Sequence, residues 1–153
     1  LMQRYLNLST GRGDVFDIRV LVQKNREGCW EVTGIAVRQG APGSITSNLH
    51  GGGHAEEAEP FLRGKYGDAT DGIIETIRSV ALRIPAVLEQ THGRLVELGV
   101  DLGVDDQGRV WVLEANSKPG RSAFAELSDK RARMASVRNP LLYASFLLNG
   151  PNP

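Results

Sequence analysis

The sequence predicts an α+β fold, in which an antiparallel sheet carries helices on its flanks. Two stretches read as β-hairpins, and apolar stretches with helical spacing follow each of them. Short turns between paired strands give antiparallel neighbours, and helices outside the strand pairs pack on the sheet. With 153 residues, the chain is long enough to bury a core of its own.

Composition and charge narrow the classes of function. Lysine plus arginine and aspartate plus glutamate each number 18, so the zero net charge argues against a chain-wide basic surface for nucleic acid. The only cysteine, Cys29, excludes a disulfide framework and a cysteine-rich zinc site, and we expect it to be a buried strand residue. No apolar run reaches the roughly 18 residues of a membrane span, and no secretory signal is visible. We expect neither a membrane protein nor a secreted one.

The first hairpin is predicted from alternating side chains. Residues 15–22 are rich in β-branched residues, and one face of this strand would carry Phe16, Ile18, Val20 and Val22. The other face would carry Asp17 and Arg19. Residues 25–28 form a turn, and residues 29–38 return as the second strand.

A glycine-rich loop is expected at residues 39–54, which contain five glycines and one proline. Long loops of this kind inside a compact domain are usually functional or mobile. A disordered surface loop is the alternative that composition alone leaves open.

Three helical stretches are predicted. Apolar residues in the range 70–92 recur at three- and four-residue steps, which indicates an amphipathic helix of about five turns that Pro85 should kink or split. Residues 121–135 are also predicted to be helical, and the dipeptide Asn139-Pro140 predicts the N-cap and first turn of a last apolar helix. Residues 55–68 fit no clear pattern.

The second hairpin, residues 94–116, carries the residues that suggest chemistry. Glu114 and Asn116 are two positions apart, so both side chains project from one face of a strand, and Asp101 on the partner strand can add a third oxygen. Oxygen ligands without cysteine favour magnesium or manganese over zinc. An edge hairpin with scattered polar residues is the alternative.

The register of this hairpin decides whether Asp101 shares that face. A two-residue loop at 107–108 pairs Asp101 with Glu114, and a four-residue loop at 105–108 pairs it with residue 112. Both keep Asp101 on the face of Glu114. A three-residue loop pairs Asp101 with residue 113 and places it on the other face. We predict one of the first two registers.

Three motifs occur in order along the chain: Asp17-Ile18-Arg19-Val20, then Arg38 with Ser47-Asn48-Leu49 and Gly51-Gly52, then Glu97-Leu98-Gly99-Val100-Asp101 with Glu114-Ala115-Asn116-Ser117-Lys118-Pro119-Gly120. Together they resemble the C-terminal part of the ATP-grasp fold, which glutathione synthetase and the ribosomal-protein glutamate ligases share. They look most similar to the YheC/YheD-like endospore coat-associated ATP-grasp proteins. The resemblance covers essentially the whole chain.

The resemblance implies an ATP-dependent ligase that phosphorylates a carboxylate, after which an amine or thiol attacks the acyl phosphate. It implies that Asp101, Glu114 and Asn116 are ligands of Mg²⁺ or Mn²⁺, and that Arg19 and Arg38 lie near the transferred phosphate. Such chemistry rests on positioning and charge neutralisation, and arginine offers phosphate a fixed fork of donors.

Further roles follow from the same resemblance. Asn48 would contact phosphate or substrate, and the loop of residues 39–54 would close over the reacting centre. Gln3 and Gly52 would contact the nucleotide, together with Arg19 and Asn116. Plain alternatives remain: Arg19 pairs with Asp17 or with another strand carboxylate, Arg38 is a solvated strand end, and Asn48 is a turn former.

The chain opens inside an apolar element, and ATP-grasp enzymes need an N-terminal lobe with phosphate-binding lysines. We therefore expect residues 1–153 to be a C-terminal ATP-grasp subdomain, a fragment that binds nucleotide poorly and is inactive alone. Expected partners are the missing lobe, a small-molecule or peptide carboxylate and a spore coat, but neither nucleic acid nor membrane, in a cytoplasmic or spore-associated protein. The competing interpretations are a non-enzymatic spore-coat structural protein and a plain cation-binding module.

Overall fold

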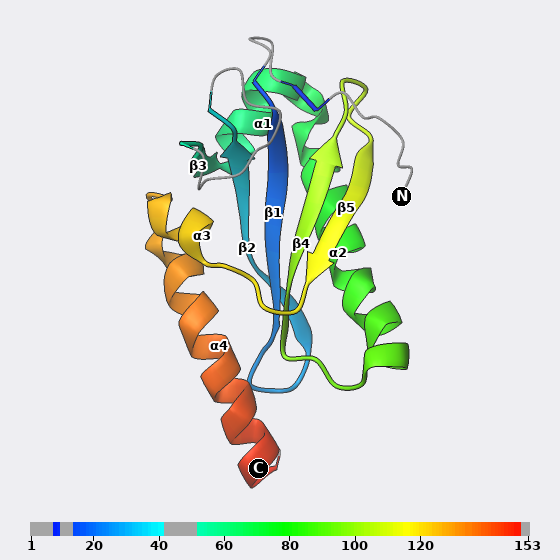
Figure 1. Cartoon of the computed structure of the whole chain (residues 1–153), viewed down its shortest axis with the longest axis vertical. Coiled ribbons are helices and arrows are strands. Elements are labelled where there is room, and N and C mark those ends of the chain that lie inside the picture. Colours follow the sequence, from blue (N-terminus) through cyan, green and yellow to red (C-terminus); the bar gives the residue numbers. More distant parts are fainter. Residues whose placement is uncertain (1–7, 10–13, 42–51, 151–153) are drawn as a thin grey trace.

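The computed structural model describes residues 8–9, 14–41 and 52–150. Its centre is a five-stranded sheet of order β3-β2-β1-β4-β5 in which every neighbouring pair is antiparallel (Figure 1). The strands are β1 Phe16–Lys24, β2 Trp30–Gln39, β3 His54–Glu57, β4 Glu97–Val104 and β5 Val110–Asn116. The helices are α1 Ala58–Tyr66, η2 Gly67–Ala69, α2 Thr70–His92, α3 Ser122–Glu126 and α4 Lys130–Asn149. The predicted α+β fold with an antiparallel sheet and flanking helices is confirmed.

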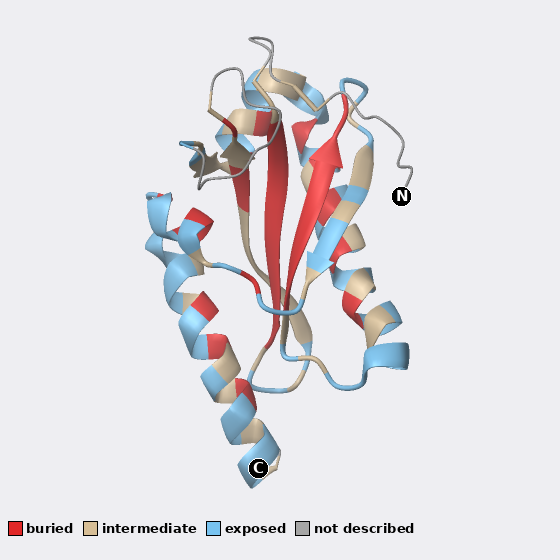
Figure 2. Cartoon of the chain, in the orientation of Figure 1, coloured by how far each residue is buried: buried red, intermediate tan, exposed pale blue. Residues whose placement is uncertain are grey.

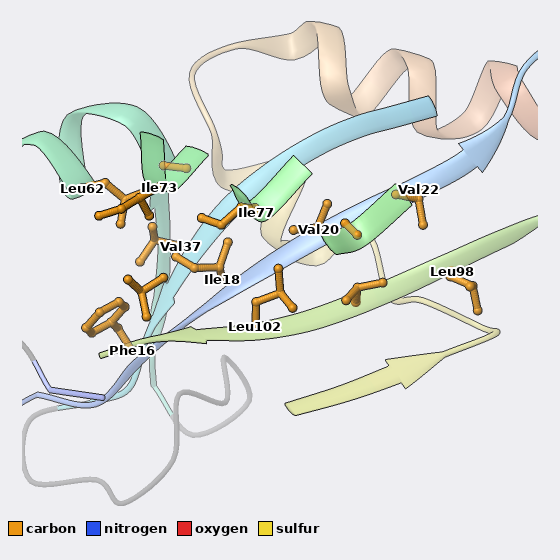
Figure 3. Packing of buried hydrophobic residues seen from close by; sticks show 14 residues of the cluster. Phe16, Ile18, Val20, Val22, Val37, Leu62, Ile73, Ile77, Leu98 and Leu102 are labelled. Atoms are coloured by element: carbon orange, nitrogen blue, oxygen red, sulfur yellow. The ribbon is translucent and has the colours of Figure 1, made fainter. Parts of the chain in front are cut away.

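The main core lies between the sheet and helices α1 and α2. The four apolar residues predicted for one face of β1 are all fully buried there, and Figure 3 shows them among side chains from β4, α1 and α2. Leu62 of α1 and Ile77 of α2 are also fully buried in this cluster. Removing this apolar surface from water is the main favourable term for the fold. Figure 2 shows β1 and β4 as the buried centre of the sheet, with more exposed strands outside them.

A smaller core lies on the opposite face, under α3 and the start of α4. It consists of Leu21, Ala36, Ala123, Phe124 and Leu127. A Cβ atom at Gly34 would lie 2.9 Å from both the Ala132 Cβ and the Phe124 Cε1 atoms, so glycine is what allows these helices to approach β2. The remainder of this face is polar, and it carries the residues described below.

Both internal prolines lie inside helices. Pro85 does not split α2, which continues from Thr70 to His92. Pro140 also lies inside a helix, because α4 already begins at Lys130 after the N-cap Asp129. The predicted helix start at Asn139-Pro140 is therefore wrong.

The side chain of Asn139 has another role, because its amide donates a 2.7 Å hydrogen bond to Glu31 on β2. Proline lacks the N–H that would bind the carbonyl four residues earlier. That carbonyl, of Ser136, accepts instead from Gln23 Nε2 at 2.9 Å and from Arg121 Nε at 3.2 Å. The proline thus frees an acceptor that ties α4 to the sheet.

Two further segments differ from the sequence-based expectation. The stretch 55–68, which fitted no pattern, holds most of β3, all of α1 and the start of η2. Cys29 is exposed rather than buried, because it lies in the turn before β2, where its backbone N–H donates to Asn25 Oδ1 at 3.0 Å.

Candidate functional site

The polar residues expected to carry function share the face of the sheet that α3 and α4 partly cover. Arg19 of β1 opposes Asp101 of β4, and Asp101 opposes Glu114 of β5. Cross-strand partners project from the same face, so these three side chains form one row. Asp17 and Arg38, which oppose each other on β1 and β2, form the adjacent row.

The second hairpin reaches this register by an unexpected route. Asp105 N donates to Arg109 O at 3.1 Å and Gly108 N donates to Asp105 O at 2.8 Å, so the loop has three residues, and Gly108 takes the required positive φ of 76°. Alone, this loop would pair Asp101 with the residue before Glu114. A β-bulge between Asp101 and Leu102 shifts the register by one and pairs Asp101 with Glu114. The predicted pairing is confirmed, and the predicted loop lengths are wrong.

The carboxylate of Asp105 organises the turn. It accepts hydrogen bonds from the backbone of Gln107 at 3.0 Å and of Arg109 at 3.1 Å, and from the side chains of Arg109 at 2.8 Å and Trp111 at 2.9 Å. Burial disfavours its charge, but the donated hydrogen bonds outweigh burial and lower the pKa of Asp105 to about 2. The hairpin end is therefore held by an ionised side chain.

Four charged side chains form the centre of the site, and we call them the arginine–aspartate cluster: Asp17, Arg19, Arg38 and Asp101. Arg19 donates two hydrogen bonds to Asp101, from Nε to Oδ1 at 2.6 Å and from Nη2 to Oδ2 at 3.0 Å. Arg38 donates two hydrogen bonds to Asp17 in the same way, from Nε to Oδ1 at 2.7 Å and from Nη2 to Oδ2 at 2.5 Å. Nη2 of Arg38 also donates to Asp101 Oδ2 at 2.9 Å, which joins the two pairs.

The cluster is buried and neutral. Its side chains are between 9% and 15% exposed, and two positive charges balance two negative ones. Burial lowers the pKa of Arg38, but the hydrogen bonds and charges of Asp17 and Asp101 outweigh it and raise that pKa. Buried ion pairs offset their desolvation cost only with such close, multiply bonded geometry.

The geometry shows how each plain alternative stands for the two arginines. Arg19 pairs with a strand carboxylate, but that carboxylate is Asp101 and not Asp17. Arg38 is not a solvated strand end, because its side chain is 15% exposed and bonded to two aspartates. Within the described residues, the Nη1 amino group of each arginine makes no hydrogen bond, so each guanidinium keeps donors for an anionic group.

Glu114 and Asn116 lie at the edge of the cluster on β5. Glu114 is exposed and Asn116 is half-buried, and neither side chain makes a hydrogen bond or ion pair with another described residue. With Asp101 they bring two carboxylates and one amide to neighbouring positions of β4 and β5, a donor set that suits a hard cation. Both oxygens of Asp101 are held by arginines, so ligation by Asp101 requires an exchange of partners.

Most other candidates fall outside the described ranges. Gln3 and Asn48 lie outside the described residues, as does most of the loop 39–54. Gly52 is described, and its φ of 88° is a conformation that favours glycine. In the described part of the chain, no group of three or more histidine, cysteine, aspartate or glutamate side chains could hold a metal ion.

The partner of Arg38 is a feature that sequence reasoning missed. Alternation placed Asp17 and Arg19 on one face, and their proximity suggested a pair within β1. The structure instead pairs Asp17 across the hairpin with Arg38. Opposite charges near the two ends of one predicted hairpin are the signal that could have found it.

Comparison with known proteins identifies the family of the chain. A family model described as YheC/D like ATP-grasp matches residues 1–147. The chain belongs to the YheC/D-like ATP-grasp family. It is 36% identical over 150 residues, 96% of its length, to the endospore coat-associated protein YheD of Bacillus subtilis (strain 168). It is 32% identical over 131 residues, 86% of its length, to the endospore coat-associated protein YheC of the same strain.

The chain matches only part of the length of each of these relatives. This ATP-grasp chain spans 32% of the length of YheD and 36% of the length of YheC. The resemblance expected from the three motifs is thereby confirmed at the level of the family. No helix within the described ranges has the length and apolar character that crossing a membrane requires.

Proposed function

We propose that this ATP-grasp chain is the nucleotide- and Mg²⁺-binding lobe of a ligase that joins a carboxylate to an amine or thiol through an acyl phosphate. The observation that carries the proposal is the arginine–aspartate cluster beside Glu114 and Asn116 on one sheet face. Because the chain spans about a third of its curated relatives, the activity is proposed for the whole protein.

Arg19 and Arg38 are the proposed catalytic cations. Their unbonded amino groups donate to oxygens of the transferred phosphoryl group and of the acyl phosphate, and Arg19 also contacts the nucleotide. Negative charge that develops there is neutralised by donors that are already fixed in place by Asp17 and Asp101. The low exposure of both arginines strengthens these interactions, because little water competes for them.

Asp101, Glu114 and Asn116 would hold Mg²⁺, or Mn²⁺ in its place, and Asn116 would also lie next to the nucleotide. A cation held there would supply positive charge that neutralises phosphate oxygens. The oxygen-only donor set supports this assignment, since it suits hard cations. Glu114 is exposed and ready to ligate, whereas Asp101 must first release guanidinium groups.

The remaining roles concern the substrate and the rest of the protein. We assign Asn48 to phosphate or substrate, Gln3 and Gly52 to the nucleotide, and the loop 39–54 to closure over a water-sensitive intermediate. The substrate is a small-molecule or peptide carboxylate, bound together with an N-terminal lobe of the same protein. We place the protein in the cytoplasm or at the spore, with a spore-coat association that both relatives' names support.

The test is ADP release by the full-length protein with ATP and Mg²⁺, over a panel of carboxylates and of amines and thiols. We expect Arg38→Ala to abolish turnover, because a fixed donor to the transferred phosphate is lost. Arg131→Ala is the matched control, since that arginine is 92% exposed and pairs with Asp129 at the helix surface. Unaltered turnover in Arg38→Ala, with the control active, would refute the assigned role.

A non-enzymatic spore-coat component with an ATP-grasp shape is the second candidate. The names of both relatives support it, because they describe association with the endospore coat and no reaction. This candidate predicts that the full-length protein releases no ADP with any substrate pair while still being recovered from the spore coat. ADP release that depends on one substrate pair would exclude it.

A further inference from the structure

The two arginines of the cluster are not equivalent. Arg38 donates to two carboxylates, with two bonds to Asp17 and one to Asp101. Arg19 donates to one carboxylate, with both of its bonds going to Asp101. Among the described residues, Asp101 is therefore the one carboxylate bonded to Arg19, and it is the second carboxylate bonded to Arg38.

This difference decides which arginine stays paired when Asp101 ligates a cation. Its two oxygens accept three hydrogen bonds from guanidinium groups, so a cation at Asp101 displaces arginine donors. After that exchange Arg38 keeps a two-bond fork to Asp17, whereas Arg19 keeps no carboxylate partner among the described residues. A guanidinium with a fork to a buried carboxylate stays in one orientation, and one without it is free to turn to another anion.

We propose, building on the function proposed above, that Asp17 is a positioning residue that keeps Arg38 in place while Asp101 exchanges guanidinium partners for a divalent cation, and that Arg19 is the arginine released by this exchange. Asp17 does not touch substrate or cation in this scheme. Its effect on the reaction passes through Arg38 and Asp101.

The charge of Asp17 should affect the affinity of Asp101 for a cation. If Asp17 loses its charge, Asp101 becomes the only carboxylate that pairs with Arg38 within the cluster. The cation then competes with two guanidinium groups that both depend on Asp101, and leaving a buried arginine without a carboxylate is costly. Weaker hydrogen bonding of Arg19 to Asp101 should raise the affinity for the cation, because Asp101 then exchanges its arginine partner more easily.

The test is Mn²⁺ binding to the full-length protein, followed by the electron paramagnetic resonance signal of free Mn²⁺ without nucleotide. We expect Asp17→Asn to weaken Mn²⁺ binding about tenfold, which corresponds to about 1.4 kcal/mol. Asp17→Glu keeps the charge and should stay within about threefold of wild type. Arg19→Lys, which loses the fork but keeps the charge, should bind Mn²⁺ about threefold more tightly.

Asp105→Asn is the matched control. Asp105 is as buried as Asp17, at 7% against 6% exposed, and it also pairs with an arginine, but in the turn between β4 and β5. We expect this variant to lose stability while it keeps wild-type Mn²⁺ affinity. A purely structural role of Asp17 predicts the same behaviour for Asp17→Asn.

The outcomes separate the two proposals. If wild type binds no Mn²⁺ and releases no ADP, the proposed function fails. If wild type binds Mn²⁺ and a folded Asp17→Asn variant binds it equally well, the positioning role of Asp17 is refuted. If Asp17→Asn does not fold, Arg19→Lys decides, since unchanged or weaker Mn²⁺ binding there contradicts the exchange of partners at Asp101.

Discussion

Asp101 receives hydrogen bonds from two arginines, although it is also the proposed ligand of a cation. The two roles use the same oxygens, which accept hydrogen bonds from guanidinium groups and donate electron pairs to a cation, so the two kinds of partner replace each other. The cluster therefore keeps the buried carboxylate of Asp101 paired with arginines. A buried carboxylate without a partner would be strongly destabilising. The same arrangement keeps the arginines oriented before any anion arrives.

At the scale of single residues, Asp105 leads to a prediction about acid stability. Its pKa falls from an ordinary value of 3.8 to about 2 in the folded chain, so folding favours the ionised form. A depressed carboxylate pKa contributes stability that is fully present above the unfolded value and is lost as the pH falls through the folded value. We expect this contribution to disappear between about pH 4 and pH 2, as measured by urea unfolding across that range.

Asp105→Asn isolates this contribution. At pH 7 the variant should be less stable than wild type, because four hydrogen bonds to the carboxylate are weakened or lost. The difference should shrink as the pH approaches 2, where the wild-type side chain also becomes neutral. A difference in unfolding free energy that stays constant from pH 7 to pH 2 would contradict the low pKa.

The residue pairs of the site could be predicted only in part. Alternation along β1 and β5 was enough to place Asp17 with Arg19, and Glu114 with Asn116, on common faces. The pairs themselves depend on register, and both hairpins contain a bulge, one between Leu21 and Val22 and one in the β4–β5 pair. A bulge is set by local backbone geometry and leaves no clear mark in the hydrophobic pattern.

At the scale of elements, the segment that follows β5 lies directly on β4 at Gly99. A Cβ atom there would lie 2.7 Å from the Cβ of Pro119, which is buried, and 3.5 Å from Nη1 of Arg19. We expect Gly99→Ala to destabilise the chain by about 1–3 kcal/mol in denaturant unfolding, because the contact is too close for an added methyl group. It should also lower ADP release by the full-length protein, since Arg19 lies within reach of the change.

A glycine in open surroundings provides the comparison. Gly64 lies in α1, and a Cβ atom there would have no neighbour within 4 Å. Gly64→Ala should stabilise the chain by about 0.5–1 kcal/mol, because alanine loses less conformational entropy in a helix. If both variants change stability in the same direction, the close contact at Gly99 does not govern the result.

Elements with strong periodicity were predictable, and those shaped by distant partners were not. The three- and four-residue spacing of apolar residues was sufficient to find α2, and alternation was sufficient to find β1. The start of α4 was misplaced because Pro140 normally marks a helix start. Its place inside the helix is compensated by Gln23 and Arg121, which bind the freed carbonyl of Ser136 from far along the sequence.

At the scale of the whole molecule, the two helical layers are held in different ways. Helix α2 buries Ile73, Ile77 and Ala81 in the large core. Helix α4 has 20 residues, of which only Ser136, Asn139 and Tyr143 are buried, and it is tied to the sheet largely by hydrogen bonds from polar side chains. Since hydrophobic burial is the dominant favourable term, the α4 layer should open at a lower free energy than the rest.

Hydrogen exchange followed by mass spectrometry tests this order. We expect amides of β1, which is buried along its whole length, to exchange most slowly, those of α2 next, and those of α4 first. Because α3 and α4 partly cover the face that carries the arginine–aspartate cluster, opening of this layer would expose that face while the sheet stays intact. Exchange of α4 and β1 at one common rate would contradict this, because it would mean that the site and the core open only when the entire chain unfolds.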